Sequence, residues 1–135
     1  MLTTGLHLLA EYHGCDRALL DDLEALRGVM REAARASGAV VVAEVFQPFT
    51  PQGVTGVVVI EESHFSIHTW PEAGYAAVDF YTCGDCEPER ADAVLRTALG
   101  AERVEVMSVR RGIPGPGASL ELTRHTRAAL GPREQ

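Results

Sequence analysis

Hydrophobic and polar positions repeat with two different periods along the first half of the chain. Residues 4–12 alternate with a period close to two, which predicts a strand. Between residues 16 and 37 the apolar positions recur every three or four residues, which predicts one amphipathic helix ending at Gly38. Two β-branched runs, residues 39–46 and 54–60, are predicted strands on either side of a connection rich in proline and glycine.

The second half of the chain continues with strands and one more helix. Residues 66–69 and 75–81 are a predicted strand pair, residues 87–99 a second helix and residues 104–109 a further strand. This order predicts an α+β fold, a two-layer sandwich in which two helices cover one face of a mainly antiparallel sheet. The other face needs a cover, and a homodimer with a substrate site between its two sheets is one way to supply it.

The pattern changes after residue 110. Residues 111–119 read RGIPGPGAS, a linker rich in glycine and proline. Residues 120–130 are expected to form a short surface helix or a loose tail. We therefore expect a single domain over residues 1–110, followed by a linker and C-terminal tail over residues 111–135.

Composition and charge narrow the class of protein. Hydrophobic residues make up 46% of the 135 residues and charged residues 23%, a balance typical of globular domains. The formal charge of −7 argues against nucleic acid or an anionic membrane as a partner, because the field of the chain repels phosphate. The N-terminal segment has no basic leader and no apolar run of spanning length, so we expect a cytoplasmic protein. Three cysteines, an odd number, argue against a disulfide framework.

Residue types that carry chemistry concentrate between residues 61 and 86. This segment holds two histidines, two of the three cysteines and the only tryptophan: His64, His68, Cys83, Cys86 and Trp70. The plainest interpretation is structural, with histidines in a sheet, a core or dimer-contact aromatic ring and two small buried thiols.

Two chemical interpretations start from the spacing of Cys83 and Cys86. The spacing fits zinc ligands, but His64 and His68 are four residues apart on a predicted strand. That spacing separates them by about 13 Å, too far for both to bind one ion. The same cysteines fit a thioredoxin-like redox pair before a helix, but the βαβ setting of that fold is missing.

A fourth interpretation starts from the Glu62-Ser63 peptide bond. If the Ser63 hydroxyl attacks the carbonyl of Glu62, an N-to-O acyl shift replaces the amide by an ester, and elimination then breaks the chain. The residue at position 63 becomes dehydroalanine and hydrolyses to a pyruvoyl group. Composition alone does not select this chemistry.

A family resemblance favours self-cleavage. The segment ESHFSIHTWPEAGYAAVDFYTCG resembles the processing and active-site segment of the bacterial and archaeal pyruvoyl-dependent S-adenosylmethionine decarboxylases. The segments GLHLLAEYHGCD and GVTGVVVIEESH are also similar, so the resemblance covers most of residues 4–110. It implies cleavage between Glu62 and Ser63 and a pyruvoyl cofactor derived from Ser63, with no metal and no pyridoxal phosphate.

The resemblance also implies roles for individual residues. Ser63 becomes the pyruvoyl group, which takes the substrate amine as a Schiff base. His68 assists processing, since imidazole exchanges protons near neutral pH, and Cys83 supplies the proton in catalysis. Thr55 stands where the family often has a serine that helps processing.

The choice of substrate stays open between two chemistries. The resemblance favours S-adenosylmethionine, whose product serves spermidine synthesis, with Phe49 stacking on adenine and Glu72 accepting the ribose hydroxyls. Relatives that decarboxylate arginine or ornithine share the cofactor segment. They need an acid to bind the distal cation of the substrate, and Glu61 mildly favours this alternative. A non-catalytic homologue or partner subunit is a further alternative, against which the three retained reactive residues argue.

Overall fold

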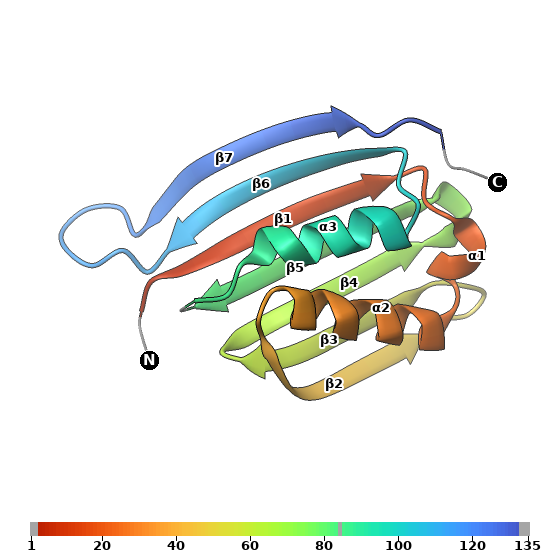
Figure 1. The fold of residues 1–135 in the computed structure, drawn as a ribbon, viewed down its shortest axis with the longest axis horizontal. Helices are drawn as coiled ribbons and strands as arrows, with labels where there is room; N and C mark the ends of the chain where they lie inside the picture. Colours follow the sequence, from red (N-terminus) through yellow and green to blue (C-terminus); the bar gives the residue numbers. More distant parts are fainter. Residues whose placement is uncertain (1–2, 84, 133–135) are drawn as a thin grey trace.

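The computed structural model describes residues 3–83 and 85–132 (Figure 1). Seven antiparallel strands form one sheet in the order β2-β3-β4-β5-β1-β6-β7. The elements, in chain order, are β1 (Gly5–His13), α1 (Arg17–Leu20), α2 (Leu23–Ala36), β2 (Val40–Pro48), β3 (Val54–Glu61), β4 (Ser63–Trp70), the 3₁₀ turn η1 (Pro71–Ala73), β5 (Tyr75–Cys83), α3 (Pro88–Ala98), β6 (Arg103–Arg111) and β7 (Leu120–Ala129).

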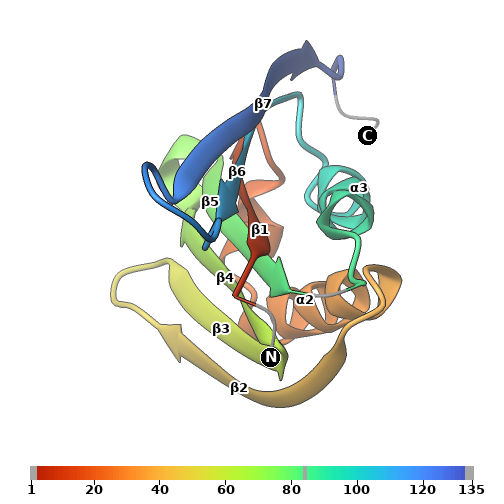
Figure 2. The same ribbon diagram turned by 90° about the vertical axis from the view of Figure 1, so that its left-hand side faces the viewer.

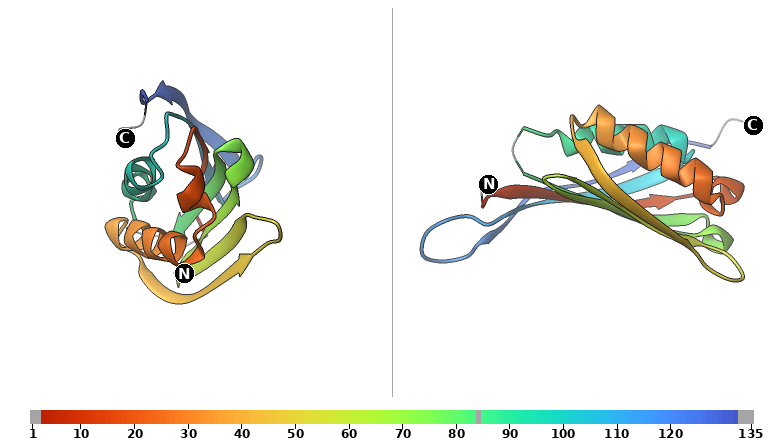
Figure 3. Two further views of the ribbon diagram at one scale, coloured as in Figure 1. Left: turned by 90° about the vertical axis from the view of Figure 1, so that its right-hand side faces the viewer. Right: turned by 90° about the horizontal axis from the view of Figure 1, so that it is seen from below.

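The two long helices lie side by side on one face of the sheet, as Figures 2 and 3 show. The helix α2 turns Leu26 and Met30 toward the sheet, because residues three or four apart share one side of a helix. Alternate side chains of the strands are buried on this face, for example Leu8, Phe65 and Phe80. The predicted two-layer α+β sandwich is thereby confirmed.

Among the residues that the structure describes, none forms a layer over the other face of the sheet (Figure 3). Since side chains alternate along each strand, the residues between the buried ones point to this open face. They include polar and chemically reactive side chains from four neighbouring strands: Thr55, His64, Ser66, His68, Asp79, His7 and Glu11. This open face is where the candidate site lies.

The prediction of one helix between residues 16 and 37 is wrong, because two helices occupy this segment. The side chain of Asp16 caps α1 and that of Asp22 caps α2, accepting hydrogen bonds from the N–H groups of Leu19 and Ala25. Capping carboxylates start new helices. The leucine periodicity continues across the break because both helices bury the same side.

The prediction of a helix or loose tail after residue 119 is also wrong. Residues Leu120–Ala129 form β7, which pairs with the whole of β6 from Arg103 to Arg111. The chain reverses through the segment 112–119, where Gly112 has φ 75° and a Cβ atom would lie 2.0 Å from the carbonyl oxygen of Thr3. Within the described residues, no helix has the length and apolarity needed to cross a membrane.

Candidate active site

Ser63 begins β4 directly after a tight turn. The strand β3 ends at Glu61 and β4 begins at Ser63, so Glu62 alone connects them. Ser63 has φ 110°, and among the described residues it is the one non-glycine residue with positive φ. Such a conformation costs about 1–3 kcal/mol and persists only where the surrounding structure imposes it. Here the chain reverses immediately before Ser63, and the sheet holds this residue on both sides, since it pairs with Ile60 and with Thr82.

Cys83 lies beside this turn at the end of β5. The Ser63 hydroxyl and the Cys83 thiol are 3.5 Å apart, and either can donate to the other. Gly5 of β1 is the ladder partner of Cys83. A Cβ atom on Gly5 would lie 3.0 Å from Sγ of Cys83 and 2.7 Å from the ring of Tyr81. Because glycine carries only a hydrogen at this position, the Cys83 thiol has the space it occupies.

His68 and Thr55 meet nearer the other end of the sheet. They are direct neighbours on β4 and β3, and Oγ1 of Thr55 lies 3.0 Å from Nδ1 of His68. The hydroxyl and the imidazole thus form a polar pair on the open face, able to exchange a proton with a group brought close to them.

Phe49 and Glu72 line a cavity of about 250 Å³ together with this pair. Trp70 forms a further wall of it. The Phe49 ring is 52% exposed and therefore available to a ligand. The residues placed here combine an aromatic face, a carboxylate and an imidazole.

An aromatic stack supports the Trp70 wall. The ring of Tyr75 is stacked between those of Trp70 and His13, with centroids 5.1 Å apart in both cases. Burial, together with a hydrogen bond to Glu11, raises the pKa of Tyr75 to about 12, so this ring stays neutral.

Two residues that the sequence did not single out hold the walls of the cavity. The Asp21 carboxylate, at the break between α1 and α2, accepts a hydrogen bond of 2.8 Å from the N–H of Gly53 in the loop that carries Phe49. The Thr69 hydroxyl donates to the carbonyl of Leu20 at 2.7 Å. Both bonds link parts of the chain that lie far apart in sequence, so no local pattern announces them.

A polar network occupies the middle of the open face. The Arg111 guanidinium donates to Nδ1 of His7 at 3.0 Å, and Nε2 of His7 lies 2.6 Å from Asp79. Because a guanidinium only donates, Nδ1 must accept, and His7 is held as the tautomer with its proton on Nε2. Burial acts to raise the pKa of Asp79, but hydrogen bonds from His7 and Ser66 outweigh it and lower that pKa.

The remaining candidates lie at the edges of this arrangement. Burial, followed by the charge of Asp85, raises the pKa of the Cys86 thiol, which disfavours a reactive thiolate. Glu61 ends β3 with an exposed side chain. Throughout residues 3–83 and 85–132, no three His, Cys, Asp or Glu side chains come close enough to hold a metal ion.

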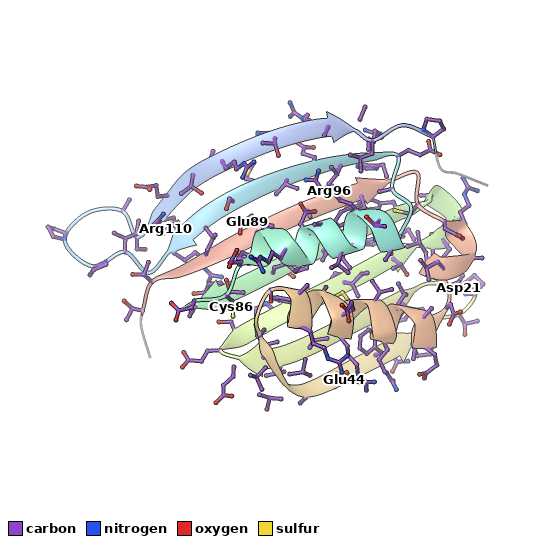
Figure 4. The ribbon with its side chains drawn as sticks, in the orientation of Figure 1. Asp21, Glu44, Cys86, Glu89, Arg96 and Arg110 are labelled. Carbon is purple, nitrogen blue, oxygen red and sulfur yellow. The ribbon has the colours of Figure 1, made fainter. Side chains whose placement is uncertain are left out.

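The candidate residues thus form two groups at opposite ends of the sheet. Ser63 and His68 are five residues apart on one extended strand, which separates them by about 17 Å. Figure 4 shows the same division, with Cys86 near the end that holds Cys83 and Asp21 at the end that holds the Phe49 loop. A single chain therefore does not bring His68 to Ser63.

Comparisons with known proteins identify the family. Residues 6–112 match the family described as S-adenosylmethionine decarboxylase. The S-adenosylmethionine decarboxylase proenzyme of Thermotoga maritima is 50% identical over 113 residues, covering 83% of this chain and 87% of that protein. The proenzyme of Caldanaerobacter subterraneus is 50% identical over 114 residues, covering 84% and 92%.

A solved structure agrees with the sequence comparisons. The crystal structure of the adenosylmethionine decarboxylase from Aquifex aeolicus superposes with a TM-score of 0.77 at 37% identity, covering 87% of this chain and 98% of that one. The fold, the ordered sequence similarity and the clustering of serine with cysteine all agree. The chain belongs to the S-adenosylmethionine decarboxylase family.

Proposed function

We propose that this chain is a self-cleaving, pyruvoyl-dependent decarboxylase of S-adenosylmethionine, whose product serves polyamine synthesis. The observation that carries the proposal is the Ser63 turn, where the hydroxyl of a serine with φ 110° lies 3.5 Å from the Cys83 thiol in a chain of this family. The tight turn serves self-cleavage and the thiol serves proton transfer, and both lie at one place.

Self-cleavage begins at the turn. The Ser63 hydroxyl oxygen attacks the carbonyl carbon of Glu62 and loses its proton as the C–N bond breaks, which leaves an ester and a free amine. Loss of the Cα proton of residue 63 then breaks the ester C–O bond and releases Glu62 as a new carboxylate. Water replaces the amine, ammonia leaves, and residue 63 ends as a pyruvoyl group. His68, with Thr55 orienting its ring, is the proposed proton carrier.

The pyruvoyl group supplies a carbonyl that binds the substrate amine and withdraws electrons as carbon dioxide leaves. The residues around position 63 fit such a group, because Cys83 already lies beside the Ser63 side chain from which it forms. Cys83 then protonates the carbon that has lost the carboxylate.

Phe49 and Glu72 are the proposed substrate contacts. The exposed Phe49 ring offers an adenine base a face on which to stack, and the Glu72 carboxylate accepts hydrogen bonds from the two ribose hydroxyls. Arginine and ornithine have no ring to stack on Phe49. The cavity therefore favours the nucleoside substrate.

A homodimer resolves the separation of the two groups of residues. His68, which lines the same cavity as Phe49, is about 17 Å from Ser63 of its own chain, so a substrate held in that cavity lies far from position 63 of that chain. If two open faces pack together with their strands reversed, Ser63 and Cys83 of one copy meet His68, Phe49 and Glu72 of the other. We propose that each active site is shared in this way.

Mixing two damaged chains tests the shared site. Cys83→Ala lacks the proton donor and Glu72→Ala lacks the ribose contact, so each alone is expected to release little carbon dioxide. Random reassortment makes half of the dimers mixed, each with one intact site, and restores about a quarter of native activity. A site built within one chain predicts no recovery on mixing.

Carbon dioxide release from S-adenosylmethionine, arginine and ornithine, measured side by side with the native chain, tests the proposed substrate. We expect release from S-adenosylmethionine alone. Release from arginine or ornithine would keep the cofactor chemistry and overturn the roles given to Phe49 and Glu72. Release from none of the three, with an uncleaved chain, would favour a non-catalytic homologue.

A further inference from the structure

The strand β7 lies outside the part of the chain that matches the family. The family match ends at residue 112, and β7 runs over Leu120–Ala129. It adds a seventh strand at the edge of the sheet next to β6 and lengthens the open face in that direction (Figure 2). A strand added at an edge enlarges any interface that the face makes.

On β7 the apolar and polar side chains point in the opposite directions from those of a strand that packs on the core. Leu120 pairs with Arg111 and Leu122 with Val109, so both leucines point to the open face. They are 63% and 59% exposed. The helix-side face of the same strand carries Arg124, which pairs with the buried Ser108. Apolar residues on the face away from the core indicate that something other than this chain's core covers them.

The proposed shared site determines what faces β7. Ser63 of one copy meets His68 of the other only if the strands of the two facing sheets run in opposite directions. In aligned sheet packing, a two-fold axis between the sheets and across the strands does this. Such an axis places each strand over the same strand of the partner. The strand β7 therefore lies over β7 of the partner.

The strand register locates this axis on β7. The axis crosses β4 midway between Ser63 and His68, at a point that lies between His64 and Ser66. Followed through the ladder pairs of β5, β1 and β6, His64 corresponds to Leu122 on β7, and Ser66 corresponds to His125. The half of one β7 that holds Leu122 thus lies over the half of the other that holds His125.

The facing half of β7 suits leucine. Glu105 of β6 accepts from Nε2 of His125 at 2.6 Å and from Nε of Arg127 at 2.9 Å, so the charges of this half are already paired within the chain. The imidazole face and the arginine methylene groups are left as contact surface for an apolar side chain.

We propose that β7 is a second part of the dimer interface, in which Leu120 and Leu122 of each copy pack on β7 of the other and strengthen the dimer. The partner is a second copy of this chain, and the inference rests on the shared site proposed above. Four leucines leave water per dimer. Replacing them should raise the dissociation constant of the dimer at least about tenfold, since 1.4 kcal/mol corresponds to a factor of ten.

The test is a dilution series of the full chain followed by sedimentation velocity. Leu120→Ser with Leu122→Ser should raise the dimer dissociation constant at least about tenfold. Glu121→Ser with Arg124→Ser, on the other face of the same strand, is the matched control and should leave it unchanged. Self-cleavage and, at concentrations that keep the dimer assembled, carbon dioxide release should persist in both double variants.

Two results would overturn the proposal, and they differ in what else they remove. A native dimer whose dissociation constant is the same in the leucine double variant would refute the role of β7 and leave the shared site intact. A native chain that is monomeric at concentrations where it releases carbon dioxide would refute both.

Discussion

Gly5 leaves space for the Cys83 thiol, and one added carbon atom would remove this space. No side chain fits at this position, because a Cβ atom would lie 3.0 Å from the thiol and 2.9 Å from the carbonyl oxygen of Thr82. One of these neighbours must shift if a methyl group is added. In the proposed mechanism the thiol is the neighbour whose position matters, because it supplies the proton.

Gly5→Ala should therefore slow decarboxylation about tenfold to a hundredfold, because small displacements of a catalytic group have effects of this size. The turnover number at saturating S-adenosylmethionine measures the effect. Gly28→Ala on α2 is the matched control, since nothing lies within 4 Å of the added carbon. Native turnover by Gly5→Ala would show that Cys83 does not depend on this space.

The break between α1 and α2 is the feature that positions the cavity of Phe49 and Glu72, the proposed substrate site. The leucine periodicity predicts one helix because it reports only which side is buried. The break frees Asp21 to hold the loop of Phe49 through Gly53. A hydrogen bond between residues 32 positions apart leaves no trace in local periodicity.

Asp21→Ala should raise the KM for S-adenosylmethionine several-fold while cleavage and the turnover number stay near native, because the loop loses its anchor and Cys83 is untouched. Asp21→Asn keeps an acceptor oxygen and should recover most of the affinity. An equal fall in turnover for both variants would contradict a role confined to positioning Phe49.

The network around Asp79 joins β1, β4 and β5 and gives the fold an acid-sensitive contribution. The folded pKa of Asp79 lies below its ordinary value, so its contribution is present above the unfolded pKa of about 3.9 and is lost as pH falls through the folded pKa.

Asp79→Asn should be less stable than the native chain at pH 7 by about 1–3 kcal/mol, the usual loss for a hydrogen-bonded charged group. Its free energy of unfolding should also depend less on pH below about 4. Urea unfolding at pH 7 and at pH 3, at one protein concentration, measures both effects. A variant with the native pH dependence would contradict the assignment to Asp79.

At the scale of the whole molecule, the sequence predicts the sandwich and misses its last strand. The helices and inner strands carry clear periods because one side of each is buried. The strand β7 has no such signal, since its leucines Leu120 and Leu122 face away from the core and the rest of it is mostly polar. Its conformation depends on pairing with β6, a contact made through a glycine-rich reversal.

The sequence locates the chemistry better than it locates the assembly. Resemblance singles out Ser63, Cys83 and His68, but their grouping follows from the sheet. The predicted strand covers residues 66–69 and leaves Ser63 outside it, so the separation of about 17 Å between Ser63 and His68 became evident only from the full length of β4 in the structure. The roles of Asp21 and His7 needed the three-dimensional structure.

The most direct test of the account is the intact mass of the purified native chain beside Ser63→Ala and Ser66→Ala. We predict two polypeptides for the native chain, residues 1–62 and 63–135, the second beginning with a pyruvoyl group and lacking a free amine. Ser66→Ala should cleave in the same way, and Ser63→Ala should stay whole. A native chain that stays whole after long incubation, or a Ser63→Ala chain that cleaves, would contradict the account.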